Sequence, residues 1–227
     1  MNKCPDCGEE YTRVAMHWRK GSCSYPELND FQTEIVKGLV MGDGYVKRRD
    51  NSPDQVRAEM TNQVFLQQVY EWLEPLSASV REYRSAEENA GRNNADSAEN
   101  YQDSYHYNSC TAPTFNQFGE WYSTGEKVWP DDIELTPVSL AILYVCDGTL
   151  SSNKPSMSIV KENHRKEYVK SLFQRLDIPV SNSMHHYTLG REEFFNTVGG
   201  PIKGFEYKWP DKFINEPSVV EVEYGKL

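Results

Sequence analysis

The chain has 227 residues, of which 38% are hydrophobic and 12% aromatic, so it can bury one sizeable core or two small ones. No apolar run approaches the roughly 20 residues that cross a bilayer, and the start lacks the apolar segment of a signal peptide. We therefore expect no contact with a membrane and no secretion, but an intracellular, cytoplasmic protein. The net charge of −10, from 24 basic and 34 acidic residues, excludes a uniformly basic surface.

The acidic excess is partly local. Residues 82–103 contain six acidic residues and only two arginines, so a basic groove elsewhere on the surface is compatible with the composition. A second interpretation is adaptation to the high-salt cytoplasm of a halophilic host, where surface carboxylates are common. Because residues 85–101 also have too little apolar content to pack, we predict that they form a mobile loop.

Three of the five cysteines lie in the first 23 residues, together with a histidine. Cys4, Cys7, His17 and Cys23 are separated by two, nine and five residues, a spacing typical of a zinc knuckle that a histidine and a third cysteine complete. So short a segment cannot fold on apolar burial alone, and metal binding would supply its folding free energy. We predict a zinc-binding module over residues 1–25, the alternative being chance cysteines in a flexible tail.

An apolar helix that ends in Asp-Gly occurs twice, at residues 36–44 and 140–148. Asp43 and Asp147 would lie at the negative ends of their helix dipoles, which is unfavourable unless a cation binds there. Two such carboxylates suggest a shared cation site, although Asp-Gly also simply ends many helices. In the first copy Gly38 and Gly42 share one helical face, so a second helix can approach closely. Asp30 or Thr33 is the predicted N-cap of this helix.

The remaining elements follow from period-two and period-3.6 patterns of apolar residues. In the first half we predict strands at 45–49, 56–61, 80–84 and 105–112, with helices at 63–77 and 114–123. In the second half we predict a strand pair that begins after Gly148 and runs through 157–161, a helix at 164–176, a strand or hairpin at 180–189 and a helix at 192–198. Lys127 and Lys208 each precede a Trp-Pro pair that closes a half. The chain is therefore a duplicated α+β unit of order αββαββα.

Basic side chains alternate along the first predicted strands. Lys47 and Arg49 share one face, and Arg57 points outward from a strand whose apolar residues face the core. Such a basic, polar sheet surface suits contact with DNA, although similar residues on exposed strands are often only solvated. The candidate DNA-binding residues are Lys47, Arg49, Arg57, Lys161 and Tyr45. For His106, His185 and His186, we rank plain exposure above contact with nucleic acid.

The two Asp-Gly helices resemble the motifs of the LAGLIDADG homing endonucleases. The matching residues are Gly38, Leu39, Asp43 and Gly44 in the first copy, and Leu140, Ala141, Asp147 and Gly148 in the second. Residues 121–141 look like the segment that precedes the second motif in the single-chain branch of the family. Lys37 stands where the family usually has a small residue, and we expect it to face solvent. The N-terminal module is not part of the family core.

The resemblance implies a fold with pseudo-twofold symmetry. Two saddle-shaped antiparallel sheets would flank two motif helices that pack at the centre, with a first half at 26–135 and a second at 136–227. In the family's single-chain branch, lysines equivalent to Lys127 and Lys208 lie beside the metal cluster. The resemblance therefore assigns Asp43, Asp147, Lys127 and Lys208 as catalytic residues.

The implied function is site-specific cleavage of both strands of DNA. Mg²⁺ or Mn²⁺ would be held by Asp43 and Asp147, with the carbonyls of Gly42 and Cys146 as further ligands. A single chain with unequal halves fits a monomer that reads a long, asymmetric double-stranded site. We expect a free-standing or intron-encoded enzyme. The alternatives are an intron-RNA maturase, a non-cleaving DNA-binding protein, and an interaction protein whose zinc module recruits a partner.

Overall fold

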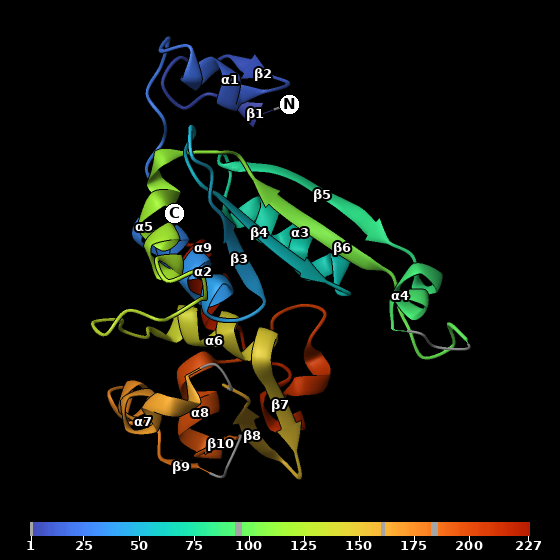
Figure 1. Ribbon diagram of the computed structural model, residues 1–227. Coiled ribbons are helices and arrows are strands. Elements are labelled where there is room, and N and C mark those ends of the chain that lie inside the picture. The colour runs from blue at the N-terminus through green and yellow to red at the C-terminus, as the bar shows by residue number, and fades with distance from the viewer. Residues whose placement is uncertain (1, 94–96, 160–161, 183–185) are drawn as a thin grey trace. The chain divides into compact units, whose positions relative to one another are not determined.

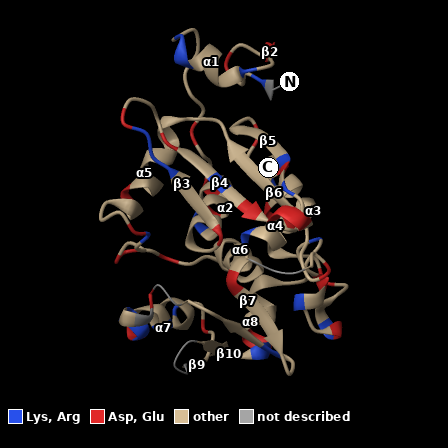
Figure 2. Cartoon of the chain, turned by 45° about the vertical axis from the view of Figure 1, so that its right-hand side comes forward, with Lys and Arg blue, Asp and Glu red and all other residues tan. Residues whose placement is uncertain are grey.

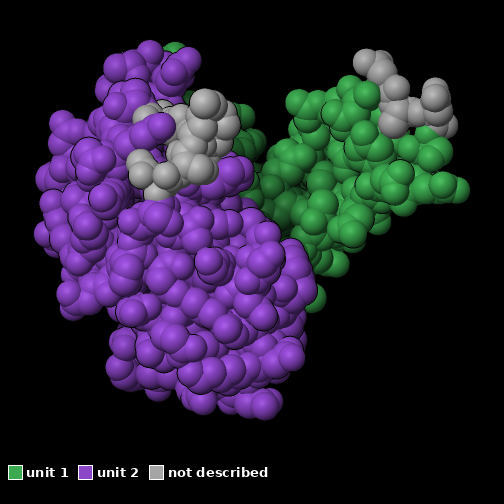
Figure 3. Space-filling view, turned by 90° about the horizontal axis from the view of Figure 1, so that it is seen from below, with its two compact units in different colours: residues 1–32, 43–120 green, residues 33–42, 121–227 purple. Residues whose placement is uncertain are grey.

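The computed structural model describes residues 2–93, 97–159, 162–182 and 186–227 (Figure 1). The elements fall into two compact units, one of residues 1–32 and 43–120 and the other of residues 33–42 and 121–227 (Figure 3). Within the described ranges, no helix is long and apolar enough to cross a membrane. The two units are described in turn.

The first unit begins with a small module of short elements. Strands β1 (Asn2–Lys3) and β2 (Glu10–Tyr11) pair antiparallel, and helix α1 (Val14–Arg19) follows them. Val14 and Trp18 are buried, and the Trp18 indole ring packs against Tyr25 at a centroid distance of 5.8 Å. So few apolar side chains make only a very small core, which fits the expectation that this segment needs further stabilisation.

Helix α2 (Asp30–Met41) links the two units through the chain. Its first turn is closed by Asn29, whose side chain accepts a hydrogen bond from the Gln32 N–H at 2.8 Å, while the Gln32 side chain accepts from the Asn29 N–H at 3.3 Å. This is a reciprocal capping box, and the predicted N-cap at Asp30 or Thr33 was therefore wrong. Gln32 also donates to the carbonyls of Trp72 and Glu74, which ties the helix start to the first unit.

The first sheet has four antiparallel strands in the order β3-β4-β6-β5. The strands are β3 (Gly44–Lys47), β4 (Gln55–Met60), β5 (Ser77–Arg84) and β6 (Ser104–Ser109). Helix α3 (Gln63–Trp72) covers one face, begins at the N-cap Asn62, and buries Phe65, Leu66 and Val69. On the sheet, Val56 and Tyr107 are fully buried beneath it, and alternate side chains point to the other face.

Two segments of the first half differ from the prediction. The predicted mobile loop contains helix α4 (Ala86–Arg92), which begins with a capping box between Ser85 and Glu88. The helix predicted at 114–123 is divided into three single turns, η1 (Pro113–Phe115), α5 (Asn116–Gly119) and η2 (Glu120–Tyr122). The loop prediction was wrong because local capping stabilises a helix start even in a segment with little apolar surface.

The second unit repeats the same order of elements. Helix α6 (Pro137–Asp147) begins with a capping box between Thr136 and Ser139. A second antiparallel sheet has the order β7-β8-β10-β9, with strands β7 (Gly148–Ser151), β8 (Lys154–Met157), β9 (Val180–Asn182) and β10 (Tyr187–Leu189). The helical elements are η3 (Asn163–Arg165), α7 (Lys166–Gln174), α8 (Arg191–Val198), η4 (Glu206–Lys208), η5 (Asp211–Phe213) and α9 (Val219–Tyr224).

The predicted α+β fold with two four-stranded antiparallel sheets is confirmed. Helix α9 was not predicted. It begins at Ser218, whose hydroxyl accepts a hydrogen bond from the Glu221 N–H at 3.2 Å, and it contacts α6 and α8 through buried side chains such as Val220. The motif helix α6 is thus enclosed by later helices of its own unit, which explains why its residues 138–145 are all buried.

Candidate active site

The C-terminal half of α2 lies directly against α6. A methyl group on Gly38 would lie 2.6 Å from both the Ile142 Cβ and the Ser139 carbonyl oxygen, and one on Gly42 would lie 2.4 Å from the Cys146 Cβ. Real Cβ atoms do not approach so closely, so only glycine fits at either position. The predicted close approach of a second helix to the face of Gly38 and Gly42 is therefore confirmed.

This close approach brings Asp147 to the end of α2. A methyl group built on Gly42 would lie 3.4 Å from the Asp147 Oδ2 atom, so this carboxylate is next to the last turn of the first motif helix. Asp147 is the last residue of α6 and is half-buried. Asp43 follows Gly42 in the chain and is exposed. Each aspartate therefore stands at the negative end of a helix and has access to solvent.

Both predicted lysines donate to carbonyls at these helix ends. The Lys127 Nζ donates to the Gly42 carbonyl, and the Lys208 Nζ donates to the Val145 carbonyl at 2.7 Å. Terminal carbonyls of a helix have no partner within the helix, and a cation near them is favourable. The lysines therefore have a structural role at the motif helices, and this role also places an ammonium group beside each Asp-Gly ending.

The two lysines sit in different surroundings. Lys208 is only 9% exposed, with its Nζ 5.0 Å from the centre of the Phe205 ring, whereas Lys127 is half-buried. The Tyr144 hydroxyl donates to the Lys208 carbonyl at 2.9 Å. Burial raises the pKa of the Tyr144 phenol, so the hydroxyl keeps the proton that it donates. Lys208 is thus held at both its side chain and its backbone by α6.

The donor set at the helix ends fits a hard divalent cation. Carboxylate and carbonyl oxygens are the ligands that Mg²⁺ and Mn²⁺ prefer, and the ends of helices concentrate carbonyl oxygens. Of the predicted ligands, Asp147, Gly42 and Cys146 lie together in the second unit. The Gly42 carbonyl already accepts from Lys127, so it would have one lone pair left for a cation.

Lys37 does not face solvent as expected. Its side chain is 16% exposed, forms an ion pair with Glu34, and donates to the Glu134 carbonyl at 3.2 Å. Glu34 also accepts a hydrogen bond from the Thr136 hydroxyl at 2.7 Å. The expectation was wrong because the segment leading into α6 covers this position, and an ion pair neutralises the partly buried charge.

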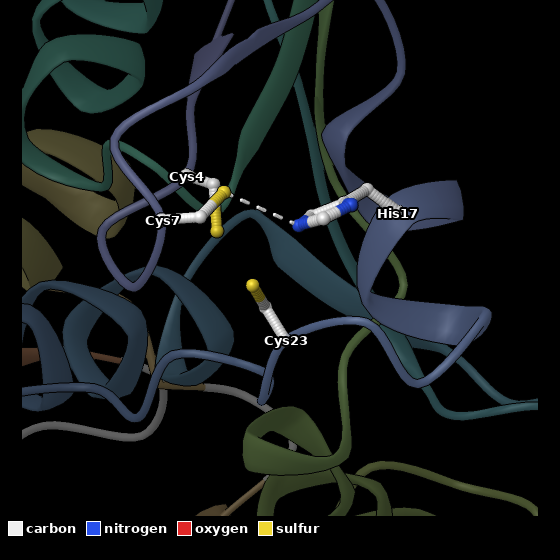
Figure 4. A group of neighbouring side chains, drawn as sticks. All are labelled: Cys4, Cys7, His17 and Cys23. Atoms are coloured by element: carbon white, nitrogen blue, oxygen red, sulfur yellow. Dashed lines mark hydrogen bonds between the residues drawn. The ribbon is translucent and has the colours of Figure 1, made fainter.

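The four predicted zinc ligands come together in the N-terminal module. One ligand atom from each of Cys4, Cys7, His17 and Cys23 lies within 4.8 Å of all the others (Figure 4). The Cys7 Sγ atom is 3.6 Å from the His17 Nε2 atom. Three sulfurs and one imidazole nitrogen form a donor set that suits tetrahedral Zn²⁺.

The surroundings of Cys4 favour its thiolate form. Burial by itself raises the pKa of the Cys4 thiol, but hydrogen bonds from the Cys7 backbone, the Trp18 indole and the Asp6 backbone outweigh it and lower the pKa to about 6. The Trp18 Nε1 atom is 3.3 Å from the Cys4 Sγ atom. By contrast, burial and the neighbouring thiols Cys7 and Cys4 raise the pKa of Cys23 to about 12. Zinc binds thiolates, so Cys4 is already close to its zinc-binding form, whereas zinc binding to Cys23 would release a proton.

Four of the five candidate DNA-binding residues lie around one end of the first sheet. Tyr45 is opposite Arg57 in the β3–β4 pair, and Lys47 is opposite Gln55. The Arg57 Nε and Arg49 Nη2 atoms both donate to the Gln55 Oε1 atom, at 3.0 and 3.3 Å. Basic residues, shown in blue, follow the end of β3 and the loop after it (Figure 2). The fifth candidate, Lys161, lies outside the described residues.

The prediction for His106 was wrong, because this side chain is only 5% exposed. It stacks on Tyr83 at a ring-centroid distance of 3.7 Å, and its Nε2 atom is 3.1 Å from the Glu59 Oε2 atom. Arg84 donates to the other Glu59 oxygen at 3.0 Å. His186 is exposed as predicted, and His185 lies outside the described residues. Cross-strand register alone, with Glu59 opposite His106, could have revealed this cluster.

A solved structure of another protein supports the α+β fold. The fold is similar to that in a structure of the homing endonuclease I-WcaI bound to its DNA recognition sequence, with a TM-score of 0.64, 14% sequence identity and 92% of each chain covered. A structure of I-DmoI in complex with DNA and Mn also matches, with a TM-score of 0.43, 12% identity, and coverage of 74% of this chain and 95% of that chain. No curated protein matches the sequence.

The family model described as the LAGLIDADG DNA endonuclease family matches residues 33–188. This range runs from α2 into β10, includes both Asp-Gly helices, and covers well over half of the chain. The chain therefore belongs to the LAGLIDADG DNA endonuclease family.

Proposed function

We propose that this protein is a site-specific endonuclease that hydrolyses both strands of DNA at a centre formed by Asp43 and Asp147. One observation carries the proposal beyond family membership. Each motif helix has an aspartate at or shortly after its last residue, and a carbonyl at the same end accepts a hydrogen bond from a lysine, Lys127 at Gly42 and Lys208 at Val145. A protein that only binds DNA has no need for this combination of carboxylate and ammonium groups at two helix ends.

In this proposal Asp43 and Asp147 hold Mg²⁺ or Mn²⁺, with the Gly42 and Cys146 carbonyls as further ligands. The bound cation supplies Lewis acidity at the scissile phosphate and lowers the pKa of water from about 16 towards 7. Lys127 and Lys208 are not ligands. Each ammonium group orders the attacking water or offsets negative charge that develops on the phosphate. Because each lysine is bound to a helix carbonyl, it is already in place before DNA arrives.

The basic end of the first sheet is the proposed DNA contact. Tyr45, Lys47, Arg49 and Arg57 are the proposed contacts there, and Lys161 is the candidate from the second half. Phosphate contacts would set the register of the protein on DNA, while base-edge contacts would select the sequence. Two halves with different side chains suit a long asymmetric site read by one chain, so we propose that the enzyme acts as a monomer.

The N-terminal residues 1–25 form a zinc-binding module in this proposal, with Cys4, Cys7, His17 and Cys23 as ligands. The convergence of their ligand atoms within 4.8 Å supports it. Zn²⁺ in this module would stabilise the fold rather than take part in hydrolysis, since a site with four protein ligands has no open position for substrate. The two halves of the nuclease would then comprise residues 26–135 and 136–227.

The test is selection of cleavage sites from a randomised double-stranded DNA library in Mg²⁺. We expect a single long site to be cut on both strands. Asp43→Asn and Asp147→Asn should each abolish cutting of that site while retaining its affinity in Ca²⁺, because Asn keeps the shape but loses the charge that holds the cation. Binding without any cleavage by the unaltered protein would favour a non-cleaving DNA-binding protein, and full cleavage by both variants would refute the proposed centre.

A further inference from the structure

Glu162 and Arg165 form an ion pair at the start of α7, and both side chains hydrogen-bond to the backbone that follows Lys127. Glu162 is 1% exposed, and its Oε2 atom accepts from the Arg165 Nε atom at 2.8 Å. Its Oε1 atom accepts from the Trp129 N–H at 2.9 Å, and the Arg165 Nη2 atom donates to the Trp129 carbonyl at 2.7 Å. Both polar backbone groups of one residue, two positions after Lys127, are therefore bound by this pair.

Further bonds hold the same segment. The Tyr168 hydroxyl donates to the Pro130 carbonyl, and the Arg165 guanidinium lies over the Tyr168 ring at 4.5 Å. On the other side, the Val128 N–H donates to the Trp121 carbonyl at 2.8 Å. Residues 128–130 are thus fixed on both sides by directional hydrogen bonds. Lys127, whose Nζ reaches the Gly42 carbonyl, is the residue immediately before them.

The Glu162 carboxylate is 1% exposed and the Arg165 side chain 18%, so this ion pair needs a reason other than stability. Removing charges from water costs several kcal/mol, and apolar residues of the same volume often stabilise a protein equally well. What apolar residues cannot do is fix the direction of a backbone through its N–H and C=O groups. This pair binds both groups of Trp129, so it is suited to fixing the backbone next to Lys127.

A different set of contacts holds Lys208. Its carbonyl accepts from the Tyr144 hydroxyl of α6 at 2.9 Å, and the neighbouring Trp209 indole donates to the Gly199 carbonyl at 2.8 Å. The ring of Tyr144 packs against Phe194 and Trp209, at 4.7 and 5.3 Å between ring centroids. The Tyr144 phenol and its apolar neighbours thus fix the backbone of Lys208, as the Glu162–Arg165 pair fixes the backbone after Lys127.

We propose that Glu162 and Arg165, with Tyr168, are positioning residues for Lys127, and that Tyr144 is the positioning residue for Lys208. The inference rests on the proposed nuclease function and adds to it that each lysine serves the cleavage of one DNA strand. Weakening the contacts around one lysine should therefore slow cleavage of one strand only, because the two sets of positioning residues do not overlap. A displacement of about 1 Å at a catalytic group can slow a reaction roughly 100-fold.

The experiment measures single-turnover cleavage of a duplex carrying the selected site, with a different label on each strand and saturating protein in Mg²⁺. Lys127→Met and Lys208→Met first establish which strand depends on which lysine. We then expect Glu162→Gln to slow the Lys127-dependent strand by roughly 10- to 100-fold while leaving the other strand near its normal rate. Tyr168→Phe, which removes one hydrogen bond and buries no charge, should slow the same strand less.

Tyr144→Phe is the reciprocal variant and should slow only the Lys208-dependent strand. Asp131→Asn is the matched control, since Asp131 contacts Arg165 through a carboxylate that is 93% exposed, and it should leave both strands unchanged. Thermal melting of each variant sets an assay temperature at which all are folded. Tyr168→Phe stays informative if Glu162→Gln does not fold.

Two results would overturn the inference. One is equal slowing of both strands by Glu162→Gln and Tyr168→Phe, which is the outcome of a general loss of stability. The other is wild-type rates on the Lys127-dependent strand in folded variants. Failure of the underlying nuclease proposal looks different, since then the unaltered protein cuts neither strand or the lysine variants cut both strands normally.

Discussion

Gly42 lies so close to Cys146 that the Cβ of any other residue at position 42 would come within 2.4 Å of the Cys146 Cβ. One turn earlier, Gly38 has the same relation to Ile142. Glycine in a helix interior lowers stability by about 1 kcal/mol relative to alanine, so Gly38 inside α2 needs a compensating gain. The gain is close contact with α6, which brings Gly42 next to Cys146 and Asp147.

Gly38→Ala should therefore destabilise the protein despite alanine's higher helix propensity. The added methyl group meets a backbone carbonyl and a Cβ atom, neither of which can rotate away, so overpacking of about 1–3 kcal/mol should exceed the propensity gain. Urea unfolding measures the change. Gly91→Ala in α4 is the matched control, because nothing lies within 4 Å of its added methyl group. It should be neutral or stabilising by up to about 1 kcal/mol, and a stabilised Gly38→Ala would contradict the described contact.

Lys127→Met and Lys208→Met should each convert a double-strand cutter into a nicking enzyme. Methionine retains much of the apolar stem but loses the ammonium group that the proposal assigns to one strand. We expect the affected strand to be cut roughly 100- to 10,000-fold more slowly, in the range for loss of general acid–base or electrostatic assistance. Supercoiled plasmid carrying the target should then accumulate as the open-circular form. Lys212→Met, at an exposed ion pair with Glu192, is the control and should linearise plasmid normally.

Much of the fold could be predicted from the sequence because its cues are local. Period-two and period-3.6 patterns indicated the strands and the long helices, and the repeated Asp-Gly endings indicated the duplication. Helix α4 and helix α9 were missed although each has a capping signal, Ser85 with Glu88 and Ser218 before Glu221. Those signals are as local as the others, so capping residues indicate both helices even though their segments have little apolar content.

Other features could not be predicted because they depend on contacts between distant residues. Lys37 is covered by the segment before α6, and His106 is shielded by Tyr83 and Glu59 across two strand pairs. The spacing of Glu162 and Arg165 resembles any surface ion pair of a helical turn, and only tertiary structure shows that it is buried around the Trp129 backbone. Conversely, the convergence of Cys4, Cys7, His17 and Cys23 was predictable because thiol and imidazole groups at short spacings have few uses other than metal binding.

Arg57→Ala should weaken DNA binding mainly through its charge. If Arg57 neutralises one phosphate, its loss should reduce the slope of log affinity against log salt concentration by about 1. Binding of the selected duplex in Ca²⁺ across a salt series measures this slope. Lys226→Ala, whose partner is Glu223 near the end of α9, is the control and should leave the slope unchanged. An unchanged slope for Arg57→Ala would remove Arg57 from the phosphate contacts.

The N-terminal module should contain one Zn²⁺ ion and lose its fold when the ion is removed. With so few buried apolar side chains, metal binding has to supply most of the folding free energy of residues 1–25. We expect one equivalent of zinc by elemental analysis, and less in Cys7→Ser, since a serine hydroxyl is a far weaker ligand. Cys110→Ser is the control, because Cys110 directly follows β6 and lies outside the cluster, so its loss should leave the zinc content at one even if it lowers stability. Chelation should also increase proteolysis within residues 1–25 before the rest of the chain is cut. A zinc-free protein with a protected N-terminus would rule out the metal site.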